Sequence, residues 1–244
     1  MLEKKIDHLR HLIEKSENIV FFGGAGVSTA SGIPDFRSAT GLYNQHTGSH
    51  YDPETILSHS FFITHPKEFY DYHLNHLLLP DAKPNPAHIA LVELESRGKL
   101  KAIITQNIDG LHQKAGSTNV LELHGNAFDF YCVSCRKHFI LDFILAHKGL
   151  PRCSHCGGIV RPNVVLYEEP LDPVTIDQAI DALSSADLLI VGGTSLVVYP
   201  AAGLINYYEG DNLVLINRAI TTHDHRATLL LRGDIAEILP SAVN

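Results

Sequence analysis

The sequence lacks any uninterrupted apolar stretch that approaches the roughly 18 residues needed to cross a bilayer. It also lacks an excess of basic residues, since 19 lysines and arginines stand against 27 acidic residues and the formal net charge is −8. A basic surface for nucleic acid is therefore not expected. No apolar signal segment follows residues 1–5, and the chain has neither an internal repeat nor a low-complexity tract. These absences predict a cytoplasmic globular enzyme with no membrane or nucleic-acid partner, and we expect a monomer.

Cysteine is scarce, and its placement is informative. All four cysteines fall in two C-x-x-C pairs, Cys132 with Cys135 and Cys153 with Cys156, and 17 residues separate the pairs. This spacing is typical of a zinc ion held by four thiolates, which leaves no coordination position open and therefore indicates a structural role. The alternatives are two disulfides or idle thiols, but nothing marks the chain for export to an oxidising compartment. We expect the nearby histidines to be surface residues.

Glycines follow a short apolar run at residues 19–22, which reads as a buried strand. Gly24 and Gly26 allow a backbone to approach a phosphate closely, because glycine has no side chain in the way. The third glycine of the dinucleotide fingerprint is replaced by Thr29, so an ordinary hydride-transferring dehydrogenase is disfavoured. Taken alone, the pattern fits equally well a glycine-rich turn in any α/β protein.

Three further apolar runs, at residues 102–104, 188–191 and 213–216, are continuous rather than alternating, as in strands buried on both faces of a parallel sheet. Each ends in a polar or glycine cluster, and in open α/β sheets such clusters meet in one crevice at the carboxyl ends of the strands. Helical spacing of apolar residues lies between the runs, for example after the capping pairs Asn85-Pro86 and Asp172-Pro173. The sequence therefore predicts an α/β fold with a Rossmann-like, mostly parallel sheet and helices on both faces.

Two insertions interrupt this pattern. Residues 41–84 are rich in aromatics and histidines and predict a helical module, while residues 126–162 carry the zinc-ribbon module. We expect the aromatics to form the core of a small lobe rather than a cofactor site. The 244 residues then make a single catalytic domain, with a large lobe from residues 1–40, 85–125 and 163–244 and a cleft between the lobes.

His124 follows a short predicted strand, residues 120–123, just before the zinc module. This position places it at the mouth of the cleft, where an imidazole can take a proton near neutral pH. A histidine at a strand end is more often a structural hydrogen-bond partner, and its position alone leaves both roles open.

Together, these motifs resemble the sirtuins, a family of NAD-dependent protein lysine deacylases. The resemblance runs in order from about residue 18 to 240 and fits compact, bacterial-type members. It rests on GAGVSTASGIPDFR (24–37), TQNIDGLH (105–112), LELHG (121–125), the C-x-x-C pairs, GTSL (193–196), Pro200-Ala201-Ala202 and Asn217.

The resemblance implies that the chain consumes NAD and binds a structural Zn²⁺. His124 is then the general base, and Asn107 lies with it in the catalytic centre. The segment Val165, Leu166 and Tyr167 pairs with the backbone of an acyl-lysine protein or peptide. The implied NAD contacts are Gly24, Ala25, Gly26 and Thr29 at the pyrophosphate and ribose; Gly193, Thr194 and Ser195 on the opposing loop; Asp35, Phe36 and Arg37 on a mobile loop; Gln106, Asn107, Ile108 and Asp109 around nicotinamide and its ribose; and Asn217, Asp234 and Ile235 at the adenosine end.

In the chemistry that this resemblance implies, the acyl-lysine carbonyl oxygen displaces nicotinamide from the ribose. His124 takes a proton from a ribose hydroxyl, and that oxygen then attacks the activated acyl carbon. Phe36 is expected to exclude water from the reactive sugar carbon. The products are nicotinamide, O-acyl-ADP-ribose and free lysine on the protein substrate.

Two segments depart from the family pattern. Tyr167 and Glu168 stand where the family usually has phenylalanine and glycine, and the glutamate either favours basic residues in the peptide or leaves an exposed side chain. Members that prefer succinyl or malonyl groups carry an arginine three residues after a tyrosine, whereas the matching stretch here begins at Tyr70 and reaches His73. Without that arginine a negative acyl end loses its bidentate partner, so neutral acyl groups such as acetyl are expected.

Rival interpretations remain. A protein mono-ADP-ribosyltransferase could use the same scaffold, and a non-catalytic sensor of NAD or ADP-ribose would need only the binding residues. Asn107, Asp109 and His124 argue against the sensor, because binding alone needs no base at the cleft mouth. A zinc-ribbon nucleic-acid binder is opposed by the acidic charge balance.

Overall fold

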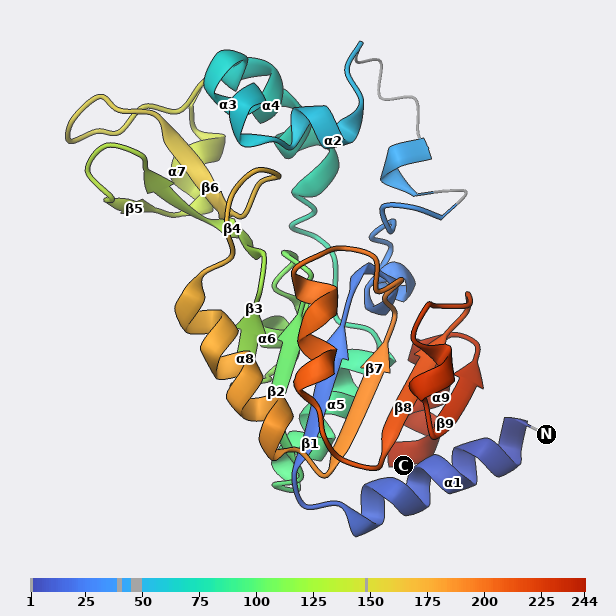
Figure 1. The fold of residues 1–244 in the computed structure, drawn as a ribbon. Coiled ribbons are helices and arrows are strands. Elements are labelled where there is room, and N and C mark those ends of the chain that lie inside the picture. Colours follow the sequence, from blue (N-terminus) through green and yellow to red (C-terminus); the bar gives the residue numbers. More distant parts are fainter. Residues whose placement is uncertain (1, 39–40, 45–49, 148) are drawn as a thin grey trace.

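Six parallel strands form the larger of two sheets in the computed structural model, which describes residues 2–38, 41–44, 50–147 and 149–244 (Figure 1). Their order is β3-β2-β1-β7-β8-β9, so the chain enters mid-sheet and winds outward in both directions. This arrangement confirms the predicted α/β fold with a Rossmann-like sheet. The strands are β1 (Ile19–Gly23), β2 (Leu100–Thr105), β3 (Val120–Glu122), β7 (Leu188–Gly192), β8 (Leu213–Asn217) and β9 (Leu229–Arg232).

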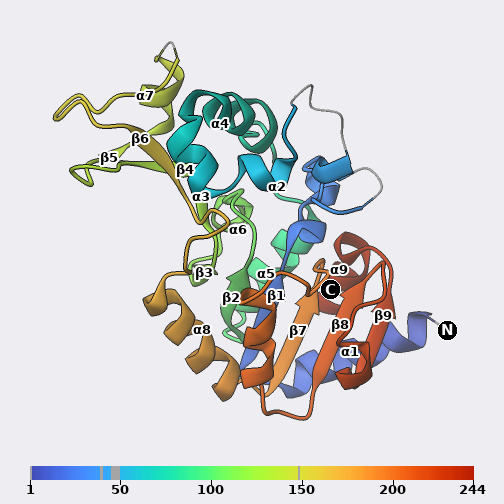
Figure 2. The same ribbon diagram turned by 45° about the horizontal axis from the view of Figure 1, so that its top comes forward.

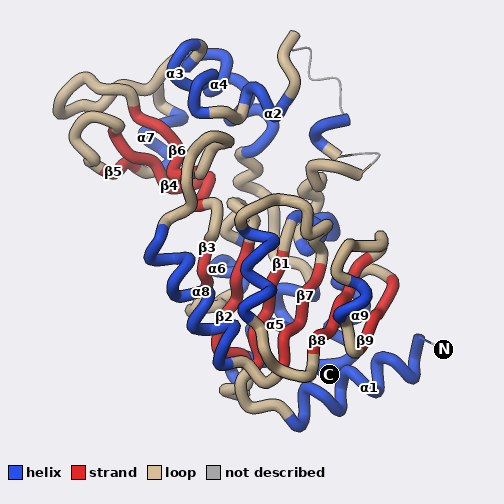
Figure 3. Tube along the Cα trace, in the orientation of Figure 1, coloured by secondary structure: helices blue, strands red, loops and turns tan. Residues whose placement is uncertain are grey.

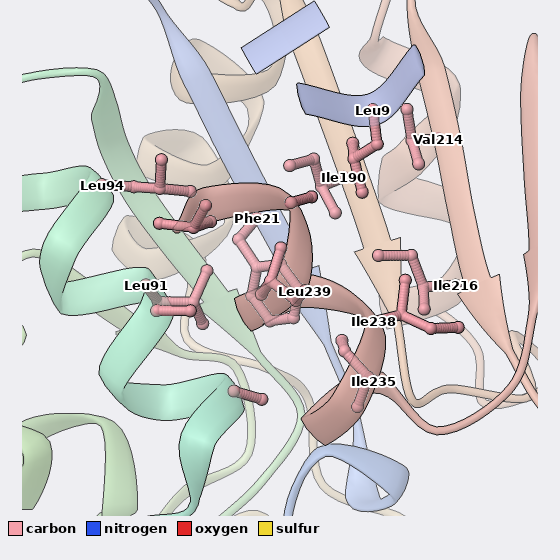
Figure 4. Close-up of a cluster of buried hydrophobic side chains, with 14 of the residues drawn as sticks. Leu9, Phe21, Leu91, Leu94, Ile190, Val214, Ile216, Ile235, Ile238 and Leu239 are labelled. Carbon is pink, nitrogen blue, oxygen red and sulfur yellow. The ribbon is translucent and has the colours of Figure 1, made fainter. Parts of the chain in front are cut away.

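Helices cover both faces of this sheet (Figure 3). Successive residues of β1 alternate between two cores, with Phe21 in one and Phe22 in the other, which explains why the strand is apolar throughout. Figure 4 shows the first core, where Phe21 lies among Leu91, Leu94 and Leu239. The helices on this face are α1 (Leu2–Lys15), α5 (Pro86–Ser96) and α9 (Ile235–Val243), and the other face carries α8 (Pro173–Ser185) and the 3₁₀ segment Ala201–Tyr207.

The predicted helix starts at residues 85–86 and 172–173 are confirmed by their caps. The Asn85 side chain accepts a hydrogen bond from the amide of Ala87, and the Asp172 side chain accepts one from the amide of Thr175. In both helices proline occupies the first turn, where no backbone donor is needed. The short helix α6 (Leu111–Ala115) lies between β2 and β3 in the chain.

A second, antiparallel sheet has the order β5-β4-β6 and lies beyond one end of the large sheet (Figure 2). Its core is shared with the helices of the 41–84 insertion, because Phe62 and Phe69 pack in the same buried cluster as Phe130 and Val160. The predicted aromatic core is confirmed for Phe61, Phe62, Phe69, Tyr70 and Tyr72. The prediction was wrong for Tyr51, which is 44% exposed, and for Tyr43, which is half-buried and lies outside this cluster. The elements are β4 (Gly125–Cys132), β5 (His138–Phe139), β6 (Val160–Val164), α2 (Pro53–Ile56), α3 (His59–Thr64), α4 (Pro66–Tyr72), the π-helix His73–Leu77 and α7 (Leu141–Leu145).

The predicted lobe boundaries stay a prediction. Met1 and residues 39–40, 45–49 and 148 lie outside the described residues. In the described part of the chain, no helix combines the length and apolar character needed to span a bilayer.

Candidate active site

The carboxyl ends of β1, β2, β7 and β8 open into one cavity of about 1110 Å³. It lies where the strand order reverses between β1 and β7, the position at which open α/β sheets bind ligands. Almost all of the residues predicted to act in binding or catalysis line it, the exception being Asp109. These lining residues are Gly24, Ala25, Gly26, Thr29, Asp35, Phe36, Arg37, Gln106, Asn107, Ile108, His124, Val165, Leu166, Tyr167, Gly193, Thr194, Ser195, Asn217, Asp234 and Ile235.

Gly26 and Gly193 bring two loops of the cavity into backbone contact. The amide of Gly26 donates a hydrogen bond of 2.7 Å to the carbonyl of Gly193. A Cβ atom on Gly26 would lie 2.8 Å from the Gly193 Cα atom, and Gly193 itself has a φ of +60°, so both positions favour glycine. The close approach leaves the backbone of two 3₁₀ turns, Ala25–Val27 and Thr29–Ser31, beside the cavity.

Two amide side chains, the buried Asn217 and the half-buried Gln106, connect the neighbouring strand ends. Asn217 accepts from the Thr194 amide at 3.1 Å and donates to the Thr194 carbonyl at 2.8 Å. The Thr194 hydroxyl in turn accepts from the Gln106 side chain at 3.0 Å. These bonds fix the ends of β2, β7 and β8 relative to one another, which gives a pre-organised wall rather than a set of loose loops.

Beside this wall lies Ser28, a buried residue that the sequence analysis did not single out. Its hydroxyl donates to the Asp109 carboxylate at 2.6 Å and accepts from the Asn107 side-chain amide at 3.0 Å. The second oxygen of Asp109 accepts from the amide of Leu111 at 2.9 Å. Asp109 is thus held behind Asn107, and its predicted contact with nicotinamide stays a prediction. The only signal for Ser28 was its place in the glycine-rich motif.

His124 has a tautomer that leaves one ring nitrogen available as a base. Its Nδ1 atom lies 2.9 Å from the Gln106 carbonyl oxygen, which can only accept, so Nδ1 carries the proton. Nε2 is then unprotonated in the neutral ring. Burial lowers the pKa of His124 from 6.5, and the hydrogen bond to the Gln106 carbonyl opposes that shift. The ring is therefore neutral at pH 7 and able to take a proton.

The segment of Val165, Leu166 and Tyr167 is fixed from both sides. The amide of Val165 donates to the His124 carbonyl at 2.9 Å, and Tyr167 exchanges backbone hydrogen bonds of 3.0 Å with Leu57 and His59. The Val165 end of the segment is consequently anchored to the backbone of His124, and the Tyr167 end is anchored to the helical module.

Glu168 and Glu169 hold the end of that segment. Glu168 is exposed and has a φ of +76°, a conformation that favours glycine, but its carboxylate accepts from the amide and the hydroxyl of Ser60, each at 2.9 Å. Glu169 accepts from the Arg161 guanidinium at 2.5 and 3.0 Å and from the Leu166 amide at 2.9 Å. Glu168 is therefore exposed, as one of the two predicted alternatives requires, and its carboxylate is already bonded within the protein.

The four cysteines form a compact cluster. All four sulfur atoms lie within 4.8 Å of one another, and the Cys132–Cys156 and Cys135–Cys153 pairs are 3.5 and 3.6 Å apart. These separations are too long for disulfides, whose sulfurs lie about 2 Å apart. They suit a tetrahedral ion with bonds of about 2.3 Å, so the four thiolates fit a structural zinc. None of His138, His147 and His155 belongs to the cluster; as expected, His138 and His155 are exposed, whereas His147 is half-buried.

Comparison with known proteins gives a consistent result. A family model described as "Sir2 family" matches residues 24–200. The NAD-dependent protein deacetylase of Clostridium perfringens is 58% identical over 244 residues, which is the whole of both chains. The NAD-dependent protein deacetylase of Clostridium acetobutylicum is 51% identical, again over the whole of both chains.

Solved structures agree with the sequence relatives. One from a study of the "mechanism and regulation of Sir2 enzymes" superposes with a TM-score of 0.89 at 40% identity, covering 99% of this chain and 97% of the other. A second, described as "Sir2-p53 peptide-NAD+", has a TM-score of 0.84 at 42% identity and covers 96% and 95% of the two chains.

Proposed function

This chain belongs to the Sir2 family, and on that basis we propose that it is an NAD-dependent protein deacetylase whose substrate is acetyl-lysine in a protein or peptide. The observation that carries the proposal is the neutral imidazole of His124, which lines the same cavity as the glycine-rich loops. A binding protein for NAD has no need of a half-buried base at this place. The zinc held by the four cysteines stabilises the small lobe and takes no part in the reaction.

The residues that line the cavity suit the parts of NAD. The Gly26 and Gly193 loops offer backbone to a pyrophosphate, and Asn217 and Asp234 line the far end, where an adenosine would lie. Asn107 lines the opposite part and is positioned by Ser28. NAD, when bound, supplies a ribose carbon from which nicotinamide leaves and to which the acetyl oxygen is transferred.

His124 acts as the general base at its Nε2 atom, where it takes a proton from a ribose hydroxyl. The Gln106 carbonyl keeps the proton on Nδ1 and so holds the ring in the correct tautomer. Phe36 lines the cavity and excludes water from the reacting centre. General-base assistance of this kind contributes about 10²–10⁴-fold to a rate.

The acyl group favoured by this cavity is neutral. Leu57, Leu77 and Leu166 line it, while Tyr70 and His73 are buried in the small-lobe core and are not among its described lining residues. Among the described lining residues, the positively charged side chains are two arginines, and no lysine is present. Arg37 is paired with Glu54, and Arg218 is paired with Asp234. A succinyl or malonyl group would therefore bring an uncompensated charge.

Replacing His124 with alanine tests the assignment. We expect the deacetylation rate of an acetyl-lysine peptide to fall by about 10²–10⁴-fold, whereas exchange of labelled nicotinamide into NAD continues, because it precedes the step that needs the base. His11→Ala, an exposed histidine of α1, serves as the control and leaves both rates unchanged. Deacetylation within threefold of the wild-type rate in His124→Ala contradicts the role given to this residue. Transfer of ADP-ribose to the peptide without acetyl loss would instead indicate the transferase.

A further inference from the structure

Two tyrosine hydroxyls join segments that are far apart in the sequence. The Tyr43 and Tyr167 hydroxyl oxygens lie 2.7 Å apart, one on the loop that carries Phe36 and the other on the segment assigned to the peptide. Arg37 reaches the same place, with Nη2 3.4 Å from the Tyr167 hydroxyl and its guanidinium 5.3 Å from the centre of the Tyr43 ring. The family usually has phenylalanine where this chain has Tyr167, so this hydroxyl is a departure from the pattern.

The two sides of this contact differ in how firmly they are held. Tyr167 is fixed through its own amide and carbonyl by Leu57 and His59, each at 3.0 Å. Tyr43 belongs to a loop whose ends pair through backbone bonds, from Tyr43 to Phe36 at 2.9 Å and from Leu42 to Asp35 at 2.7 Å. These bonds join residues 35–36 to residues 42–43, and the tyrosine pair ties Tyr43 to the peptide segment.

Phe36 contacts Tyr43 through both its ring and its backbone. Its ring packs edge-on against Tyr43 with 5.4 Å between the ring centres, and its backbone carbonyl accepts from the Tyr43 amide. Displacement of Tyr43 therefore displaces Phe36 from the cavity that both residues line. Burial, with the bond to Tyr167 as a second cause, raises the pKa of Tyr43, so Tyr43 remains a protonated phenol that can donate and accept.

We propose that Tyr167 is a positioning residue that couples the peptide site to the NAD site through its hydroxyl bond to Tyr43. A bound peptide covers Tyr167, which is 37% exposed in the free protein, and removes water that competes for the two hydroxyls. The bond between the two hydroxyls is stronger in that state, which favours the position of Tyr43 that holds Phe36 over the cavity. Because such coupling is reciprocal, NAD raises the affinity for the peptide by the same factor. The inference rests on the proposed assignment of residues 165–167 to peptide binding.

Binding measurements test this coupling without turnover. The affinity for an acetyl-lysine peptide is measured by calorimetry with and without saturating carba-NAD, a carbocyclic analogue that cannot release nicotinamide. The ratio of the two dissociation constants is the coupling factor. We expect Tyr167→Phe and Tyr43→Phe each to lower it by about two- to tenfold, the range of one neutral hydrogen bond, and the double variant to lower it no further. Tyr207→Phe removes a hydroxyl outside the cavity and leaves the factor unchanged.

A coupling factor in Tyr167→Phe equal to that of the wild type overturns the proposal. So does a loss in the double variant that equals the product of the two single losses, since the hydroxyls would then act independently. Lack of coupling in wild-type protein that does deacetylate the peptide overturns it as well. If wild-type protein leaves the acetyl group in place when NAD is present, the proposed function fails instead.

Discussion

Replacing Glu169 with glutamine removes the negative partner of a buried guanidinium. The Arg161 side chain is 5% exposed, and Glu169 receives both of its terminal nitrogens together with the Leu166 amide and the His59 ring. Breaking such a pair by removing one member costs about 3–5 kcal/mol, and the glutamine oxygen can keep one of the bonds. We expect a loss of about 3 kcal/mol, which for a chain of this length lowers Tm by about 6–12 °C.

The pH dependence of that loss follows from the pKa of Glu169. Burial alone raises it, but the bonds from Arg161, Leu166 and His59 outweigh burial and lower it from 4.5 to about 2. A carboxylate with a depressed pKa contributes stability that is fully present above pH 4.5 and is lost as the pH falls toward 2. The difference in Tm between wild type and Glu169→Gln should therefore stay constant from pH 8 to 5.

Thermal unfolding followed by circular dichroism measures both effects. His59→Asn is the matched control, because His59 is 48% exposed and its bond to Glu169 contributes at most about 1 kcal/mol. A Tm shift below about 2 °C for Glu169→Gln would refute the energetic reasoning. A difference that shrinks between pH 8 and 6 would refute the assignment of the effect to the carboxylate.

Three further predictions concern the metal site, the glycine contact and the catalytic base. Removing zinc with a chelator should unfold the small lobe. Mass spectrometry should then show the loss of one zinc per chain, and a protease should cleave within residues 126–162. A lobe that stays intact without metal would contradict a structural role. Gly26→Ala should weaken NAD binding, measured by calorimetry, at least tenfold, because the added Cβ atom has no room. Gly203→Ala, where the nearest atom is 3.6 Å from the added Cβ atom, should change the affinity less than twofold. Equal affinities in the two variants would contradict this prediction. Burial lowers the pKa of His124, so the acid limb of kcat/KM should have its midpoint below pH 6.5, and a midpoint above 6.5 would exclude His124 as that base.

Much of the fold could be predicted because its signals are local. Strands β1, β7 and β8 are buried at every position, and a strand buried on both faces must be a continuous apolar run. The helix starts at Asn85 and Asp172 and the paired C-x-x-C motifs depend on neighbouring residues in the same way. Strand β9 and helix α9 were not predicted. β9 offers a run of only three leucines before Arg232, and α9 contains Pro240, so neither presents the usual pattern.

Contacts between distant segments could not be predicted from the residues alone. The sequence places Ser28 in the glycine-rich motif, but only the fold brings it to Asp109, 81 positions away. The bond between Tyr43 and Tyr167 spans 124 positions and depends on a loop conformation. Glu168 had two interpretations because its partner lies on α3, and only the folded chain shows that partner to be Ser60.

The central claim is that acetyl-lysine is deacetylated with consumption of NAD in a reaction that depends on His124. Mass spectrometry of an acetyl-lysine peptide, incubated with the purified protein in the presence and absence of NAD, tests it most directly. We expect acetyl loss only with NAD, with one nicotinamide and one O-acetyl-ADP-ribose formed for each acetyl group removed, and a loss of this reaction in His124→Ala. Acetyl loss without NAD, or nicotinamide release with the peptide unchanged, would contradict it.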